Sequence, residues 1–171
     1  EAGQVFTSST GVIGERLPDD RITAKLADLV DGLAPGGFEA AARAIMTTDT
    51  YPKGAGTVVE IDGKPVKIAG IAKGSGMIAP DMATMLVYIF TDAVIGQEAL
   101  QILLRTLTDQ TFNCITVDSD TSTSDTLLCA ATGKSGVDVS ESTGFTLALH
   151  DVMLDLAQQV GLTPSGVTRA L

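Results

Sequence analysis

The sequence predicts a mixed α/β fold, because strand-like and helix-like segments alternate along it. β-Branched and apolar residues gather over 58–61, 66–68 and 85–90, whereas 22–33 and 99–107 repeat apolar residues at helical spacing. The hydrophobic share of 44% is sufficient for a packed core. A length of 171 residues favours one domain or part of one.

Two helices are expected in the first third of the chain. The first follows Pro18, is capped by Asp19 or Asp20, and continues to the turn at Pro35-Gly36-Gly37. The second is rich in alanine and runs from about Phe38 to Met46. A short extended segment over 5–9 is predicted before them.

A β-hairpin is predicted next, with Asp62-Gly63 as the primed turn between strands over 58–61 and 66–68. A glycine-rich loop over 72–80 then leads into a buried strand over 85–90. This junction between loop and strand is the segment where we expect the chemistry to lie.

The remaining elements are a helix over 99–107, a strand over 114–118, a short helix over 126–131 and a long final helix that contains 145–156. The polar run over 118–125 lacks the glycine and the closing glutamate of an EF-hand, so we interpret it as a strand-to-helix turn.

The charge disfavours two classes of partner. Eleven basic and 21 acidic side chains give a net charge of −10. Such a field repels the phosphates of nucleic acids and anionic lipids. The longest apolar run, Met85 to Phe90, is too short to span a bilayer. We therefore expect no nucleic-acid partner and no membrane association.

The compartment is expected to be the cytoplasm. No basic segment followed by an apolar stretch is visible at the start of the sequence. Cys114 and Cys129 are too few for a disulfide framework or a zinc site, so we interpret them as reduced core thiols. No metal is expected.

Thr84 is the candidate nucleophile, since it stands where the glycine-rich loop enters the strand. Breakage of the Ala83–Thr84 bond would give Thr84 a free α-amine beside its own hydroxyl. An α-amine has a pKa near 8 and can act as the general base for that hydroxyl. A buried threonine that merely opens a strand is the alternative, because β-branched residues favour strands.

Several motifs in this chain together resemble one family. The run Ala72-Lys-Gly-Ser-Gly-Met-Ile-Ala-Pro-Asp-Met-Ala-Thr-Met-Leu86 is similar to the autocleavage signature of the ornithine acetyltransferase family, the bifunctional enzymes of arginine biosynthesis. Further matches keep the family's order: Ser9-Thr-Gly-Val-Ile-Gly14, Ala44-Ile-Met-Thr-Thr-Asp-Thr50, Thr91-Asp-Ala93 and Cys114-Ile-Thr-Val-Asp-Ser-Asp-Thr-Ser-Thr-Ser-Asp125. The resemblance extends from about Val5 to Val160.

The resemblance implies an activity. The precursor would cut itself between Ala83 and Thr84, which separates an α-chain-like part, 1–83, from the start of a β-chain-like part, 84–171. Thr84 would then carry acetyl from N-acetylornithine to glutamate. Some members also take acetyl from acetyl-CoA, so this co-substrate stays open; no cofactor is implied. The family fold is a layered αββα arrangement similar to that of N-terminal-nucleophile hydrolases.

The resemblance also implies further site residues. Thr10 and Gly11 match the family's oxyanion pair, and Thr47 and Lys73 match positions that bind substrate, as does Thr84. The alternatives are a strand-ending turn for Thr10-Gly11, a solvated loop lysine for Lys73, and hydroxyls bonded to backbone for Thr47.

The resemblance fails at the end of the sequence. Residues 161–171 do not match the family's pattern, which has a substrate-binding glutamate in that region. The chain therefore reads as a single partial domain. Two alternatives to the transferase stay open: a related self-cleaving amidase or aminopeptidase, and a truncated remnant without activity. We expect the α and β parts to associate and the chain to form homo- or hetero-oligomers, because missing strands leave open sheet edges.

Overall fold

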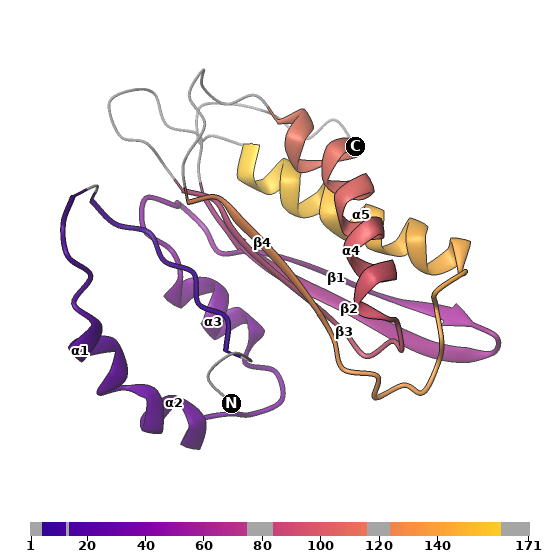
Figure 1. Ribbon diagram of the computed structural model, residues 1–171, viewed down its shortest axis with the longest axis horizontal. Coiled ribbons are helices and arrows are strands. Elements are labelled where there is room, and N and C mark those ends of the chain that lie inside the picture. The colour runs from indigo at the N-terminus through magenta and orange to yellow at the C-terminus, as the bar shows by residue number, and fades with distance from the viewer. Residues whose placement is uncertain (1–4, 13, 75–83, 116–123, 162–171) are drawn as a thin grey trace.

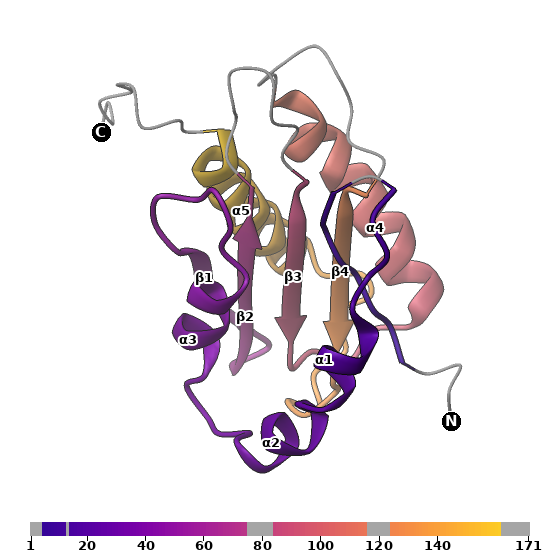
Figure 2. The ribbon, with the colours of Figure 1, turned by 90° about the vertical axis from the view of Figure 1, so that its left-hand side faces the viewer.

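The computed structural model describes residues 5–12, 14–74, 84–115 and 124–161. These ranges form one four-stranded sheet in the order β1-β2-β3-β4, with helices on both faces (Figures 1 and 2). The predicted α/β class is confirmed.

The β-hairpin lies where the sequence predicts it. Strands β1 (Lys53–Ile61) and β2 (Lys64–Lys73) pair antiparallel, with Val59 opposite Val66. The connecting turn has positive φ angles at Asp62 (49°) and Gly63 (73°), as the primed turn requires. Both strands are longer than the sequence indicated, so Ala72 and Lys73 belong to β2 and not to the following loop.

The second half of the sheet contains a parallel pair. Strand β3 (Leu86–Thr91) is antiparallel to β2, and β4 (Thr126–Ala131) is parallel to β3. Parallel neighbours need a crossover connection, and α4 (Gln97–Gln110) lies in it. The sheet therefore places the start of β3 beside the start of β4.

Two predictions for this region are wrong. Residues 126–131 form β4 instead of a helix, because backbone pairing with the buried strand β3 overrides the helical preference of a leucine- and alanine-rich run. Cys114 and Ile115 are not in a strand, since Phe112–Cys114 forms a 3-10 helix, η2, after α4. The rest of the predicted strand, 116–118, lies outside the described residues.

The core lies between the sheet and the long helix α5 (Thr143–Gly161), which confirms the predicted final helix. Figures 1 and 2 show α4 and α5 on one face of the sheet and α1–α3 on the other. α5 buries a stripe of side chains against the strands: Phe145, Leu149, Val152, Met153, Leu156, Ala157 and Val160. Helix α4 covers the sheet less closely, and only Leu107 of its residues is buried.

The predicted helix over 22–33 is divided into α1 (Asp19–Thr23) and α2 (Leu26–Asp31). Asp19 and Asp20 lie inside α1, and no side chain caps it. The apolar residues of this segment stay exposed, and Leu33 is 81% accessible. Helix α3 (Phe38–Ala44) lies close to its prediction and buries Ala42.

The two cysteines differ in their surroundings. Both are free, but Cys114 is exposed, so the prediction of a core thiol is wrong for it. Cys129 on β4 is partly buried, and its burial raises the pKa of its thiol to about 11. Across the described ranges, no helix is long and apolar enough to cross a membrane.

Contact between β2 and α5 depends on a missing side chain at Gly70. A Cβ built there would lie 2.8 Å from Leu156 Cδ1 and 3.1 Å from Ile89 Cγ1. We predict that Gly70→Ala lowers the free energy of unfolding by about 1–3 kcal/mol through overpacking. Urea unfolding followed by circular dichroism measures this change.

Gly54→Ala on β1 is the matched control. Its added Cβ would lie 3.6 Å from the Gly70 carbonyl oxygen, an ordinary contact, so a change below about 1 kcal/mol is expected. Equal effects of both substitutions would contradict close packing at Gly70.

Candidate functional site

Thr84 lies at the entrance of β3, where the sequence predicts the nucleophile. It is 8% exposed. The next residue, Met85, donates its N–H to Asp125 Oδ1 at 2.8 Å and accepts the Thr126 N–H at 3.0 Å. The backbone beside Thr84 is therefore held by the start of β4. Ala83, the other side of the expected cleavage point, lies outside the described residues.

The end of β2 reaches Thr84 from the opposite side. Gly74 has φ +133°, a conformation that favours glycine. A Cβ built on Gly74 would lie 3.4 Å from Met85 Cα and 3.5 Å from the Thr84 carbonyl oxygen. The absence of a side chain thus lets the two segments approach closely.

Lys73, next to Gly74, is a buried residue with 1% exposure, so the alternative of a solvated loop lysine is wrong. Burial lowers the pKa of its amine, and the nearby charge of Lys53 acts in the same direction. The carboxylates of Asp49 and Asp125 act against these effects, but the pKa stays below its ordinary value of 10.5. The site therefore contains an amine that releases its proton more readily than a solvated lysine.

Asp49 connects several parts of the site. Its Oδ1 accepts the Gly74 N–H at 2.8 Å and is paired with Lys53 Nζ at 2.5 Å. Its Oδ2 accepts the Thr47 N–H at 3.2 Å. The ion pair with Lys53 is enclosed, with side-chain exposures of 1% for Lys53 and 0% for Asp49. One carboxylate thus joins the segment after α3, the start of β1 and the end of β2.

The hydrogen bonds determine the charge state of Asp49. Burial alone would raise the pKa of its carboxyl group. The donors Lys53, Gly74 and Thr47 outweigh burial, and the pKa lies below its ordinary value of 3.8. Asp49 is therefore ionised near neutral pH and balances the charge of Lys53, whose Nζ also lies 4.8 Å from the centroid of the Tyr51 ring.

The predicted oxyanion residues belong to the N-terminal segment. This segment crosses the face of the sheet that carries α1–α3, and it turns at the end where β3 and β4 begin (Figure 2). It is anchored by the hydroxyls of Ser8 and Tyr88, which lie 2.5 Å apart. Thr10 is partly buried and Gly11 is exposed. The described part of the segment, 5–12 and 14–18, forms no strand, and a hydrogen bond joins the Val12 carbonyl to the Glu15 N–H.

The structure thus groups most of the predicted residues at one end of the sheet. Lys73 and Thr84 are placed there by the ends of β2 and β3, and the exposed Thr47 is held there by Asp49. Sequence reasoning missed Asp49, Lys53 and Asp125 as parts of this group. A carboxylate and an amine four residues apart were the signal that could have indicated an ion pair. Asp49 lies in the motif Ala44–Thr50, and Lys53 follows shortly after it.

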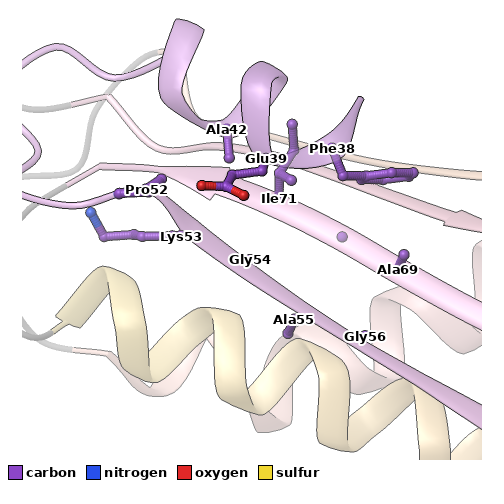
Figure 3. Close-up of a pocket in the computed structure, with 11 residues that line it drawn as sticks. Phe38, Glu39, Ala42, Pro52, Lys53, Gly54, Ala55, Gly56, Ala69 and Ile71 are labelled. Atoms are coloured by element: carbon purple, nitrogen blue, oxygen red, sulfur yellow. The ribbon is translucent and has the colours of Figure 1, made fainter. Parts of the chain in front are cut away.

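A separate pocket of about 390 Å³ lies between α3 and the β1–β2 hairpin (Figure 3). Its lining includes Gly54 and Gly56 of β1, which have no side chains to fill it. Lys53 belongs to its lining, but Thr47, Lys73 and Thr84 do not. This pocket is therefore a neighbour of the candidate site and not its centre. Among the described residues, no group of three metal-binding side chains is present.

The chain matches the model of the ArgJ family over residues 1–171. This range includes 161–171, for which we expected no resemblance. The chain is 68% identical over 167 residues to the "Arginine biosynthesis bifunctional protein ArgJ" of Ruegeria pomeroyi, which covers 98% of this chain and 41% of the relative. It is 56% identical to the protein of the same name from Gluconobacter oxydans, over 96% of this chain and 40% of that relative.

A third relative with this name, from Caulobacter vibrioides, is 53% identical over 96% of the chain and 42% of the relative's length. The chain therefore spans about two fifths of the curated relatives that it matches.

We predict that Asp49→Asn destabilises the protein by about 3–5 kcal/mol, since it leaves Lys53 buried without a counter-charge. The loss should be largest near neutral pH. Asp49 has a lowered pKa when folded, so its contribution is present above about pH 4 and disappears as the pH falls through the folded pKa. Urea unfolding between pH 2.5 and 7 measures both effects.

Glu39→Gln provides the control for Asp49→Asn, because Glu39 also pairs with a cation four residues away, Arg43, but at an exposed site. A change below about 1 kcal/mol is expected there. If the two substitutions had the same effect, the buried pair would not stabilise the fold.

We also predict that Lys73→Met does not destabilise the protein at neutral pH. The folded state lowers the pKa of Lys73, so the unfolded chain binds more protons between that pKa and 10.5. Wild-type stability should therefore rise with pH in this window relative to Lys73→Met. Thermal unfolding from pH 7 to 10.5 measures the difference, with the exposed Lys64→Met as control; a parallel profile for wild type and Lys73→Met would contradict the prediction.

Proposed function

This chain belongs to the ArgJ family, and we propose that it is the portion of a self-cleaving acetyltransferase that contains the nucleophile, Thr84. The observation that carries the proposal is the position of Thr84. It is buried at the entrance of β3 and lies close to Gly74, the residue that follows the buried Lys73. The close relatives named for arginine biosynthesis support the same assignment.

Self-cleavage is the first proposed step. The Thr84 hydroxyl attacks the Ala83 carbonyl carbon, and the peptide nitrogen of Thr84 leaves and takes up a proton. Water then hydrolyses the resulting ester, which leaves a carboxylate on Ala83 and a free amine and hydroxyl on Thr84. The products are the α part, 1–83, and the β part, which begins at 84.

Acetyl transfer is the second proposed step. The Thr84 amine accepts the proton of its own hydroxyl while the oxygen attacks the acetyl carbonyl of N-acetylornithine. Ornithine leaves with a proton on its nitrogen, and an acetyl ester remains on Thr84. The amine of glutamate then attacks this ester, which forms N-acetylglutamate and restores the hydroxyl. Acetyl-CoA is a further candidate donor, and no cofactor is required.

The neighbouring residues have proposed roles in these steps. The Gly11 N–H and the Thr10 hydroxyl donate hydrogen bonds to the oxyanion that forms when a carbonyl is attacked. Lys73 binds the carboxylate of the substrate and favours the neutral form of the Thr84 amine by its charge. Thr47 contacts the substrate from the segment held by Asp49. Each role requires the end of the sheet to stay rigid.

The setting of the enzyme is also part of the proposal. We place it in the cytoplasm, with small molecules as substrates and without nucleic acid or membrane as partners. The α and β parts stay associated after cleavage, because β2 of one part and β3 of the other are paired along six residues. The chain spans about two fifths of the length of its curated relatives. A chain that stays uncut would therefore favour the alternative of an inactive remnant.

We predict that the purified chain separates under denaturing conditions into two species, one of which begins at Thr84. Thr84→Ala should give a single uncut chain, because no hydroxyl is present to attack Ala83. Thr84→Ser should still be cut, since it keeps the hydroxyl. Intact-mass spectrometry and N-terminal sequencing provide the measurement.

Thr57→Ala serves as the control for Thr84→Ala, since Thr57 lies in strand β1 of the same sheet and is outside the proposed site. It should be cut like the wild type. A single uncut species for the wild-type chain, or cleavage of Thr84→Ala, would overturn the proposed function.

A further inference from the structure

Asp125 contacts the peptide group that follows the nucleophile. Its Oδ1 accepts the N–H of Met85 at 2.8 Å. That N–H belongs to the amide bond between Thr84 and Met85, so the carboxylate holds the same peptide unit that carries the Thr84 carbonyl. None of the roles in the proposed reaction uses this contact.

The contact lies just outside the regular ladder between β3 and β4. The paired residues of this ladder begin with Leu86 opposite Thr126. Met85 and Asp125 each precede the ladder by one residue, and the Thr126 N–H donates to the Met85 carbonyl at 3.0 Å. Met85 is therefore held through both of its backbone polar groups, and the side chain of Asp125 supplies the acceptor that no strand residue supplies.

Gly74 limits the other side of the same peptide unit. The positions of Met85 Cα and the Thr84 carbonyl oxygen are within 3.5 Å of the place where a Gly74 side chain would begin. Asp49 fixes Gly74 through its N–H at 2.8 Å. The peptide unit between Thr84 and Met85 thus lies between Gly74 on one side and Asp125 on the other.

We propose that Asp125 is a positioning residue for the Thr84 nucleophile, an inference that rests on the proposed function. The hydrogen bond to Met85 fixes the plane of the Thr84–Met85 peptide. A fixed plane sets the position of the Thr84 Cα–C bond and so limits the positions that the hydroxyl of Thr84 can take. Attack on a carbonyl needs the reacting atoms close together and aligned, and a displacement of 1 Å can slow a reaction about 100-fold.

The carboxylate of Asp125 also acts on the site by its charge. It is one of the two carboxylates that oppose the lowering of the Lys73 pKa. The hydrogen bond and the charge are separable by substitution. Asp125→Asn removes the charge and keeps an oxygen that accepts the Met85 N–H, whereas Asp125→Ala removes both.

Asp92 provides a matched control at the opposite end of the sheet. Its Oδ1 accepts the Lys67 N–H at 2.8 Å, which is the same kind of contact at the same distance. Asp92 directly follows β3, whereas Asp125 lies beside its start. A loss of stability common to such contacts should therefore appear in Asp92→Ala as well, without any effect on the nucleophile.

The test measures the rate of self-cleavage of the full chain by intact mass at successive times after its synthesis in a cell-free system, for wild type, Asp125→Ala, Asp125→Asn and Asp92→Ala. Thermal unfolding of each variant is followed in parallel. We expect Asp125→Ala to be cut about 10- to 100-fold more slowly than the wild type. The cleavage rate of Asp125→Asn should lie within about 5-fold of the wild-type rate, and Asp92→Ala should be cut at the wild-type rate.

Three results would overturn the inference. The first is cleavage of Asp125→Ala at the wild-type rate. The second is equal slowing of Asp92→Ala and Asp125→Ala, which would show a general loss of stability. The third is the failure of Asp125→Asn to recover. In each of these cases the wild type is still cut and the proposed function stands, whereas an uncut wild-type chain would overturn both.

Discussion

The buried ion pair between Asp49 and Lys53 is the interaction on which the candidate site depends. Two charges removed from water are costly unless their remaining hydrogen-bonding capacity is satisfied. Here the carboxylate also accepts the backbone N–H groups of Gly74 and Thr47. The pair therefore fixes the ends of three chain segments in one arrangement, and Lys73 and Thr84 lie where those segments meet.

The hydrophobic core supports this polar end from one side of the sheet. Helix α5 packs its apolar stripe on β1 and β2, and Val160 near its end lies 3.6 Å from the position of a Cβ on Gly74. Gln159 of the same helix exchanges hydrogen bonds with the backbone of Gly54. The packing of α5 thus helps to fix the positions of β1 and β2 near the candidate site.

The other face of the sheet is less completely covered. Phe90 on β3 is 42% exposed and Val58 on β1 is 61% exposed. Leu29 in α2 and Leu33 after it are still more exposed. Large exposed apolar surfaces are unusual for a protein in isolation. This finding agrees with a chain that spans about two fifths of its curated relatives.

Local motifs and patterns were enough to predict the family, the hairpin at Asp62-Gly63, the final helix and the place of Thr84 where a loop enters a strand. The folded chain was needed to show that residues 126–131 form a strand, because their partner is β3, about 40 positions earlier. It also brought Asp49 to Gly74 and Asp125 to Met85 across separations of 25 and 40 residues. Such contacts leave no periodic pattern in the sequence, since they arise from the pairing of strands and not from the residues next to them.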